Sequence, residues 1–399
     1  MHDQPKSRPR ITLLPGHEKR ARHGHPWIYS NEIAMDAAAK ALPPGTLVTV
    51  VTAEGTQVAA ATFNPHTLIA ARVLTREAGS HIHDEFVRRR LRRALDIRER
   101  LYPRPFYRLV HAEADGLPGL VVDRYGDVLA AQVNTAGMAL LWPSVLESLQ
   151  ALLSPRAVVL RGDSPARTQE GLPLGVEVAA GELDGPVEIE ENGGRFPVDV
   201  LGGQKTGWFF DQRDNRAWVA RLAAGARVLD CYSYGGGFAV AAALGGARSV
   251  LAIDRSEPAL ASAAAAAGLS GVEEVCSFKR AEVFAELEGR VKGEDRWDLV
   301  IADPPAFVKS KKDLGSGTRG YRKLAKLSAQ ATAPGGYLFI ASCSHNVDLP
   351  LFSEQVARGL ADAGRQGRIL RTGGAGPDHP VHPLLPESAY LKSMTLALD

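Results

Sequence analysis

The sequence predicts an α/β protein in three parts, and three observations carry this prediction. Short β-branched runs fill the first 80 residues, strands surround one apolar helix up to about residue 200, and strand and helix patterns alternate after that. A length of 399 residues also favours two or three domains. We therefore expect a β-rich domain at 1–80, a central α+β domain at 81–195 and a C-terminal α/β domain at 196–399.

Composition and cysteine usage exclude several classes of protein. No run of about 18 apolar residues occurs, and the first ten residues lack an apolar core. We therefore expect neither a membrane span nor a secretory signal. The three cysteines, Cys231, Cys276 and Cys343, are too few and odd in number for a disulfide framework and fit the reducing cytoplasm. No CxxC or HxxxH spacing occurs, so no metal site is expected.

The first 105 residues predict strands followed by a helix. Residues 45–65 contain short β-branched runs that are interrupted by glycine and by an Asn-Pro pair. Residues 85–101 have the spacing of an amphipathic helix, with the arginines expected on the polar face. The apolar face is expected to hold Phe86, Leu91, Leu95 and Ile97.

Strands return around one helix between about 106 and 200. Residues 117–134 predict a hairpin with its turn at "YGD", and residues 139–153 predict a helix. Residues 157–164 form another predicted strand. The stretch 187–201 predicts a strand pair that turns at Gly193 and Gly194.

After residue 200 strands and helices alternate, which predicts a parallel, doubly wound sheet. Ligands of such sheets bind at the carboxyl ends of the strands. The expected strands are 227–233, 249–256, 297–305 and 336–344, and the expected helices are 236–246, 258–271 and 321–336.

Two of these strands end in an acid, and a glycine run follows the first of them. Asp230 precedes the loop that contains Gly235–Gly237, and Asp254 ends the next strand. Glycines let the backbone turn sharply and approach a ligand, while an acid at the second position suits the two hydroxyls of a ribose. The pattern indicates a cofactor that carries a nucleoside. Tight turns with solvated aspartates are the alternative.

Two cofactors compete for this site. A nicotinamide dinucleotide calls for G-x-G-x-x-G, which is absent, and Asp230 would repel its pyrophosphate. The same acid would pair well with the ammonium group of S-adenosylmethionine. Glu282 follows the next predicted strand and either contacts the adenine amino group or is a plain exposed glutamate.

The other end of the sheet suggests chemistry on a base. Asp303, Pro304 and Pro305 end one strand, and the prolines leave carbonyls and a carboxylate to accept hydrogen bonds from a base. Cys343 ends a neighbouring strand, where a thiolate could add to carbon 6 of a pyrimidine and activate carbon 5 for methylation. The alternatives are an ordinary "DPP" turn and a buried packing cysteine. Cys231 and Cys276 lack such a setting.

Basic residues gather in three places although the net charge is only +2. They provide phosphate contacts or form a solvated surface. The clusters are Lys6, Arg8, Arg10, Lys19, Arg20 and Arg22; the arginines within 88–93; and the lysines within 309–312.

Several motifs in order make the chain similar to a known family. It resembles the bacterial class I methyltransferases, with an N-terminal PUA domain, that make 5-methylcytidine in large-subunit ribosomal RNA. The resemblance spans nearly the whole chain. Its motifs are "RHGHPWIYSNEI" at 22–33, "EADGLPGLVVDRYGD" at 113–127, "GQKTGWFFDQRDNR" at 203–216, "DCYSYGGGF" at 230–238, "DPPAF" at 303–307 and "SCSH" at 342–345.

The resemblance implies S-adenosylmethionine as methyl donor, a Rossmann-like C-terminal domain and RNA binding by the PUA domain. It makes Cys343 the nucleophile, assisted by Asp303, and makes the basic loop 308–323 a mobile element that closes over RNA. The family usually has a hydroxyl residue at Gly235 and an aspartate at Glu282. The implied cofactor-binding residues are Lys205, Phe210, Gln212, Arg213, Asp230, Tyr232, Ser233, Gly235, Asp254, Arg255, Glu282, Asp303 and Pro304.

Three other functions stay open. An N-methyltransferase acting on a base needs no thiol, but it typically has an aromatic directly after "PP", where this chain has Ala306. A catalytically silent RNA-binding assembly factor would keep the fold without binding the cofactor. A dehydrogenase is disfavoured by the missing fingerprint. The oligomeric state is open as well, with a homodimer as one option.

Overall fold

The computed structural model describes residues 8–399, which divide into two compact units. The first unit contains the described residues up to Gly185, together with Asp199–Trp208 and Asp378–Pro386. The second contains Pro186–Val198, Phe209–Pro377 and Glu387–Asp399. The chain thus passes between the units repeatedly. Domain boundaries at 80 and 195 remain a prediction, and Lys6 of the first basic cluster lies outside the described residues.

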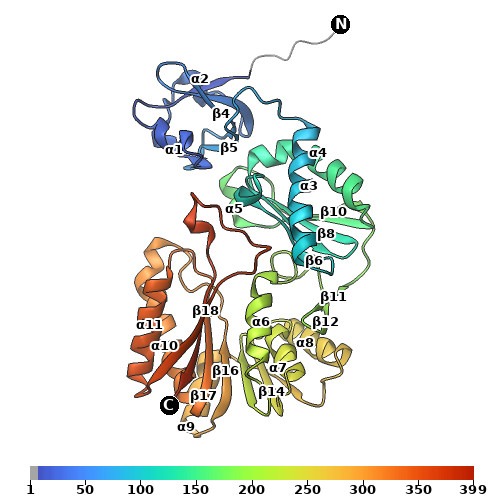
Figure 1. Ribbon diagram of the computed structural model, residues 1–399, viewed down its shortest axis with the longest axis vertical. Helices are drawn as coiled ribbons and strands as arrows, with labels where there is room; N and C mark the ends of the chain where they lie inside the picture. The colour runs from blue at the N-terminus through green and yellow to red at the C-terminus, as the bar shows by residue number, and fades with distance from the viewer. Residues whose placement is uncertain (1–7) are drawn as a thin grey trace. The chain divides into compact units, whose positions relative to one another are not determined.

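The first sheet of the first unit has five strands in the order β1-β3-β4-β5-β2 (Figure 1). The β-branched side chains of β3 favour a strand inside the sheet, and Val48 and Val50 on this strand are fully buried. The strands are β1 Arg10–Thr12, β2 Trp27–Ile28, β3 Thr46–Val51, β4 Gln57–Phe63 and β5 Ala71–Thr75. The short helices are α1 Glu18–Arg22, η1 Ser30–Glu32 and α2 Ala37–Lys40.

A second five-stranded sheet has the order β10-β9-β8-β7-β6. The predicted hairpin is β7 with β8, and Gly126 in its turn has a φ of +69°. The strands are β6 Phe106–His111, β7 Leu120–Tyr125, β8 Val128–Val133, β9 Ala157–Gly162 and β10 Gly175–Gly181. The helices are α3 Asp84–Leu101, η2 Ala112–Asp115, α4 Ala136–Leu153 and α5 Pro165–Gln169.

Helix α4 is the one described helix that is long and apolar enough to cross a membrane, judged by length and composition alone. Its side chains Met138, Leu141, Val145 and Leu149 are buried in one core with residues of α3 and of the central sheet. This packing is that of a core helix.

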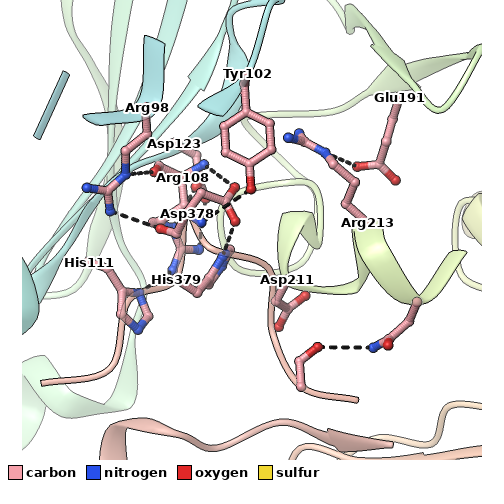
Figure 2. Close-up of polar contacts among 12 residues, drawn as sticks. Arg98, Tyr102, Arg108, His111, Asp123, Glu191, Asp211, Arg213, Asp378 and His379 are labelled. Carbon is pink, nitrogen blue, oxygen red and sulfur yellow. Dashed lines mark hydrogen bonds and ion pairs between the residues drawn. The ribbon is translucent and has the colours of Figure 1, made fainter. Parts of the chain in front are cut away.

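Helix α3 departs from the predicted polar face. Ile97 is 41% exposed, whereas Arg98 is fully buried. The Arg98 guanidinium donates to both carboxylate oxygens of Asp115, at 2.7 and 2.8 Å. It also donates to the carbonyl of Asp378 at 2.9 Å (Figure 2). Helical periodicity assigns an arginine to the solvent-exposed face of a helix. Here the hydrogen bonds of the guanidinium offset the free-energy cost of burying its charge. The segment Asp378–Pro386 therefore contributes to the interior of the first unit.

The second unit is built on a seven-stranded sheet of order β15-β14-β13-β16-β17-β19-β18. All pairs from β15 to β17 are parallel, and β19 runs antiparallel to both neighbours. Its strands are β13 Arg227–Cys231, β14 Ser249–Asp254, β15 Cys276–Arg280, β16 Trp297–Ala302, β17 Thr332–Ser342, β18 Gly367–Gly373 and β19 Lys392–Leu398. The predicted Rossmann-like fold is confirmed.

Helices surround this sheet, and a separate hairpin lies against one of them. The helices are α6 Arg213–Ala220, α7 Gly237–Leu244, α8 Glu257–Leu269, α9 Val283–Lys292, α10 Leu314–Ala331 and α11 Leu349–Asp362. Short 3-10 turns are η3 Phe210–Gln212, η4 Lys311–Asp313 and η5 Pro386–Ser388. The hairpin is β11 Val187–Glu191 with β12 Gly194–Val198, and it contacts α8.

Candidate active site

The carboxyl ends of four strands meet at one edge of the seven-stranded sheet. Register pairs Cys231 on the central strand β13 with Ile253 on β14 and with Ala302 on β16. Ala302 in turn pairs with Ile340 on β17. Asp254 directly follows Ile253 at the end of β14, Asp303 directly follows Ala302 after β16, and Cys343 directly follows β17. These three residues therefore leave the sheet at the edge where β13 ends with Asp230 and Cys231.

Two buried polar side chains at this edge lack a well-formed hydrogen bond. Asp230 is 1% exposed and Ser233 is 6% exposed, yet neither side chain has a hydrogen bond of normal geometry with a described residue. Burial is the main reason why the pKa of Asp230 is raised well above its ordinary value, and the charge of Asp303 raises it further. A weaker interaction with the backbone N–H of Ala239 lowers the pKa of Asp230 only in part. Unpaired buried polar groups are costly, so these two are suited to receive the donors of a ligand.

The backbone of the loop after β13 contains three residues with positive φ. Tyr232 and Tyr234 have φ values of +63° and +48°, and Gly236 has a φ of +78°. A Cβ atom on Gly236 would lie 2.8 Å from the Cβ of Ala263 on α8. Such strained segments persist where the surrounding structure fixes them, often at functional sites. Asp254 is part of that support.

Asp254 fixes the loop through two backbone amides. Its carboxylate accepts from the N–H of Tyr234 at 3.0 Å and from the N–H of Ser256 at 2.8 Å. The acid is half-buried, so part of its surface stays accessible. Arg255 and Glu282 are exposed. Burial is the main reason why the pKa of Tyr232 is raised, and the charge of Glu282 raises it further.

The residues from the "GQKTGWFFDQRDNR" motif separate between the two units. Phe210, Gln212 and Arg213 belong to the second unit, whereas Lys205 belongs to the first, where it is exposed. The Arg213 guanidinium lies 5.2 Å from the centroid of the fully buried Phe210 ring and 3.5 Å from a carboxylate oxygen of Glu191 (Figure 2). The Gln212 side chain accepts from Asn215 at 2.7 Å. The side chains of Phe210, Gln212 and Arg213 are thus held by contacts within the second unit.

Cys343 lies directly after β17 and beside the end of β16. Its Sγ is 4.0 Å from the carbonyl oxygen of Pro304. The thiol is half-buried, unlike that of Cys231, which is fully buried. Burial raises the pKa of Cys231 and raises that of Cys276 to about 11, which keeps both thiols protonated. The structure thus brings the half-buried Cys343 thiol to the "DPP" turn. The backbone of Cys231 also lies beside this turn, since its carbonyl accepts from the N–H of Asp303 at 3.5 Å, but its thiol is fully buried.

The predicted mobile loop at 308–323 is wrong for its second half, which is helix. Helix α10 begins at Leu314 and includes Gly317 and Gly320. A Cβ atom on Gly317 would lie 2.4 Å from Val308 Cγ2, and one on Gly320 would lie 3.0 Å from the Phe307 ring. These glycines therefore allow α10 to pack closely on the segment after "DPP". The glycine content that predicted a mobile loop serves this close packing instead.

A buried network joins α10 to the turn after Cys343. The Tyr321 hydroxyl and the Ser344 hydroxyl are 2.8 Å apart, and Ser344 also accepts from the N–H of Val308 at 3.1 Å. Tyr321 and Ser344 are fully buried. The sequence analysis missed both residues, as well as the buried Lys392 on β19, because no motif spacing relates side chains from three distant elements.

The histidine of the "SCSH" motif forms an aromatic pair with a residue close to β19 in the sequence. The rings of His345 and Tyr390 lie 5.2 Å apart at an interplanar angle of 31°. The Tyr390 hydroxyl donates to the buried Asp211 carboxylate. His345 lies in the motif "SCSH" and Asp211 in the motif at 203–216, whereas Tyr390 lies in no motif quoted above. Among residues 8–399, no group of three or more His, Cys, Asp or Glu side chains could hold a metal ion.

Comparison with known proteins gives two family matches. Residues 173–366 match a family described as "S-adenosylmethionine-dependent methyltransferase". Residues 11–76 match the family of PUA-like domains. The chain is also 37% identical over 388 residues to Ribosomal RNA large subunit methyltransferase I of Cronobacter sakazakii, covering 96% of this chain and 98% of the relative. It is 39% identical over 393 residues to the protein of the same name from Aeromonas hydrophila, covering 97% and 98%.

Solved structures share the whole fold. A Streptococcus mutans protein described as an S-adenosylmethionine-dependent methyltransferase superposes with a TM-score of 0.83 at 19% identity, covering 98% of this chain and 100% of that chain. A methyltransferase complexed with S-adenosylhomocysteine superposes with a TM-score of 0.84 at the same identity and coverage. At this identity the likeness concerns the fold alone.

Proposed function

Because this chain belongs to the family of the Ribosomal RNA large subunit methyltransferases I, we propose that it methylates carbon 5 of a cytidine in large-subunit ribosomal RNA through a covalent adduct with Cys343. The family makes the chain an S-adenosylmethionine-dependent methyltransferase. The observation that supports the finer statement is the place of Cys343, directly after β17 with its Sγ 4.0 Å from the Pro304 carbonyl.

The cofactor contacts that we propose start from the two unpaired buried groups. The Asp230 carboxylate and the Ser233 hydroxyl fit the ammonium and other donors of S-adenosylmethionine, which supplies an electrophilic methyl group when bound. Asp254 would accept from the ribose hydroxyls. Tyr232, Gly235, Arg255, Glu282 and Pro304 would complete the cofactor contacts around the sheet edge, with Lys205, Phe210, Gln212 and Arg213 lining or covering it.

The chemistry that we propose for Cys343 is a temporary addition. The thiolate adds to carbon 6 of the cytosine, while Asp303 holds or protonates nitrogen 3 as electron density moves into the ring. Carbon 5 becomes nucleophilic and forms a bond to the methyl group, whose bond to the sulfonium sulfur breaks. A base or water then removes the proton from carbon 5, and the electron pair of that C–H bond reforms the double bond between carbons 5 and 6. The bond between carbon 6 and sulfur breaks at the same time, and its electron pair leaves with the thiolate.

RNA contacts would come from the PUA-like domain and the basic clusters. Phosphate contacts position a nucleic acid without specifying its sequence. Not every arginine is available for this. Arg90 donates to the carbonyl of Leu74 at 2.6 Å and lies over the Phe86 ring, and burial lowers its pKa to about 10. Ribosomal RNA as the substrate also places the protein in the cytoplasm, and a homodimer remains our hypothesis for its assembly.

Methyl transfer by cysteine variants tests the proposal. We expect Cys343→Ala to lose methylation of ribosomal RNA, while calorimetry shows S-adenosylmethionine binding close to that of the wild type. Cys276→Ser is the matched control, because the Cys276 thiol does not follow a strand beside the "DPP" turn. This variant should retain full activity. Full activity in Cys343→Ala would exclude the nucleophile and favour N-methylation. Absence of cofactor binding by the wild-type protein would favour a silent RNA-binding assembly factor.

A further inference from the structure

A buried lysine supports the turn that carries the thiol. Lys392 begins β19 and pairs in register with Ser342, the last residue of β17. Its residue is 6% exposed. The ammonium donates to the carbonyl of Ser344 at 2.7 Å and to the carbonyl of Val347. Both acceptors lie within five residues of Cys343, so one side chain ties together the whole turn from the thiol to α11.

Within residues 8–399, the Lys392 ammonium donates to backbone carbonyls and forms no ion pair with a carboxylate. Leu391, directly before β19, and Met394 and Leu396 on β19 are buried apolar residues, so packing alone would be served by another apolar side chain. Burying an ammonium is costly unless it is hydrogen-bonded. Its presence at this position therefore points to a role for the charge.

We propose that Lys392 is a positioning residue for Cys343, which fixes the turn after the thiol and places a positive charge beside it. This inference rests on the proposed function of Cys343 as a nucleophile. A nearby cation favours the thiolate over the thiol, because the charged form of the cysteine is the one that it attracts. The reactive form of the nucleophile would thus be populated at neutral pH without a histidine as general base.

The titration of the lysine limits the pH range of this effect. Burial lowers the pKa of Lys392 to about 8, while negative charge on Cys343 and on Asp348 raises it. Asp348 is exposed and already caps α11 by accepting from the N–H of Leu351 at 2.9 Å. The ammonium is therefore present below about pH 8 and is lost above it. The stabilisation of the thiolate should follow the same course.

Alkylation of the full-length protein by iodoacetamide, read for each cysteine peptide by mass spectrometry, tests this directly. Across about pH 6 to 9 we expect Cys343 of the wild type to react faster than Cys276, the internal reference. Lys392→Met should slow alkylation of Cys343 about tenfold at neutral pH, equivalent to a rise of about one unit in its pKa. Lys392→Arg, which keeps the charge, should restore most of the rate. Cys276 should react equally in all three proteins.

The outcomes separate charge from structure and from the proposed reaction. Melting temperature and S-adenosylmethionine binding show whether each variant is folded. The proposal is overturned if Cys343 in folded Lys392→Met has the same pH profile of alkylation as in the wild type. It is also overturned if Cys343 is alkylated equally slowly in Lys392→Arg and in Lys392→Met. If Lys392→Met does not fold, wild-type Cys343 reacting no faster than Cys276 at neutral pH overturns it. Because no RNA is present, these results stand apart from the methylation test of Cys343→Ala.

Discussion

Replacing Asp230 by asparagine should change stability and cofactor binding in opposite directions. Asp230 is buried, has no well-formed hydrogen bond, and has a pKa raised well above its ordinary value. A carboxyl group with a raised pKa in the folded state destabilises the fold as pH rises from about 4 through that pKa, because the unfolded chain releases the proton more readily. Asp230→Asn removes this loss and should make the ligand-free protein more stable at neutral to alkaline pH.

The same change removes the acceptor that we propose for the cofactor's ammonium group. A hydrogen bond to a charged group contributes about 1.5–3 kcal/mol, so affinity for S-adenosylmethionine should fall about 10- to 150-fold. A stabilisation of about 1 kcal/mol would raise the melting temperature of a domain of this size by about 2–4 °C. Calorimetry measures the affinity, and thermal unfolding of the ligand-free protein at several pH values measures the stability.

Asp254→Asn is the matched control, because that carboxylate accepts from two backbone amides at 3.0 and 2.8 Å. It should weaken cofactor binding and also lower the melting temperature, since the loop loses its support. The reasoning about Asp230 is refuted if Asp230→Asn binds S-adenosylmethionine as tightly as the wild type. It is also refuted if the variant loses stability as Asp254→Asn does.

Two further substitutions test the frame around the site. Gly236→Ala should destabilise the protein by about 2–5 kcal/mol and abolish cofactor binding, since it combines a φ of +78° with a 2.8 Å approach to Ala263. Gly271→Ala, with a φ of +67° and nothing within 4 Å, carries only the backbone cost of about 1–2 kcal/mol; equal melting temperatures for the two variants would contradict the packing argument. Tyr321→Phe removes the hydroxyl 2.8 Å from Ser344 and should cost about 1 kcal/mol in thermal unfolding and reduce methyl transfer. Unchanged activity and melting temperature would show that this network does not support the turn.

Periodicity and punctuation predicted the architecture of the second unit well. The strands around Asp230, Asp254 and Asp303 are short apolar runs that end in an acid, a pattern that arises locally and survives folding. Because parallel strands end at one edge, their side chains could be placed together without knowing any distance. The Cys343 position followed from the same rule.

The errors concern residues whose roles depend on distant partners. Arg98 is buried because Asp115 and the Asp378 segment, 280 residues later in the chain, complete its hydrogen bonds. Gly317 belongs to a helix because close packing on Val308 requires the absence of a side chain. Lys392 binds carbonyls that lie more than 40 residues earlier. A sequence window contains none of these relationships, so helical periodicity and composition predicted the wrong environment for Arg98 and Gly317 and gave no prediction for Lys392.

Covalent trapping tests the proposed reaction most directly. Fluorine in place of the carbon 5 proton blocks the last step, so RNA that contains 5-fluorocytidine should remain attached to the enzyme after methyl transfer. We expect a stable adduct in the presence of S-adenosylmethionine, with mass spectrometry locating the RNA on the Cys343 peptide, and no adduct with Cys343→Ala. Active wild-type enzyme that forms no adduct, or an adduct on Cys231 or Cys276, would contradict the account.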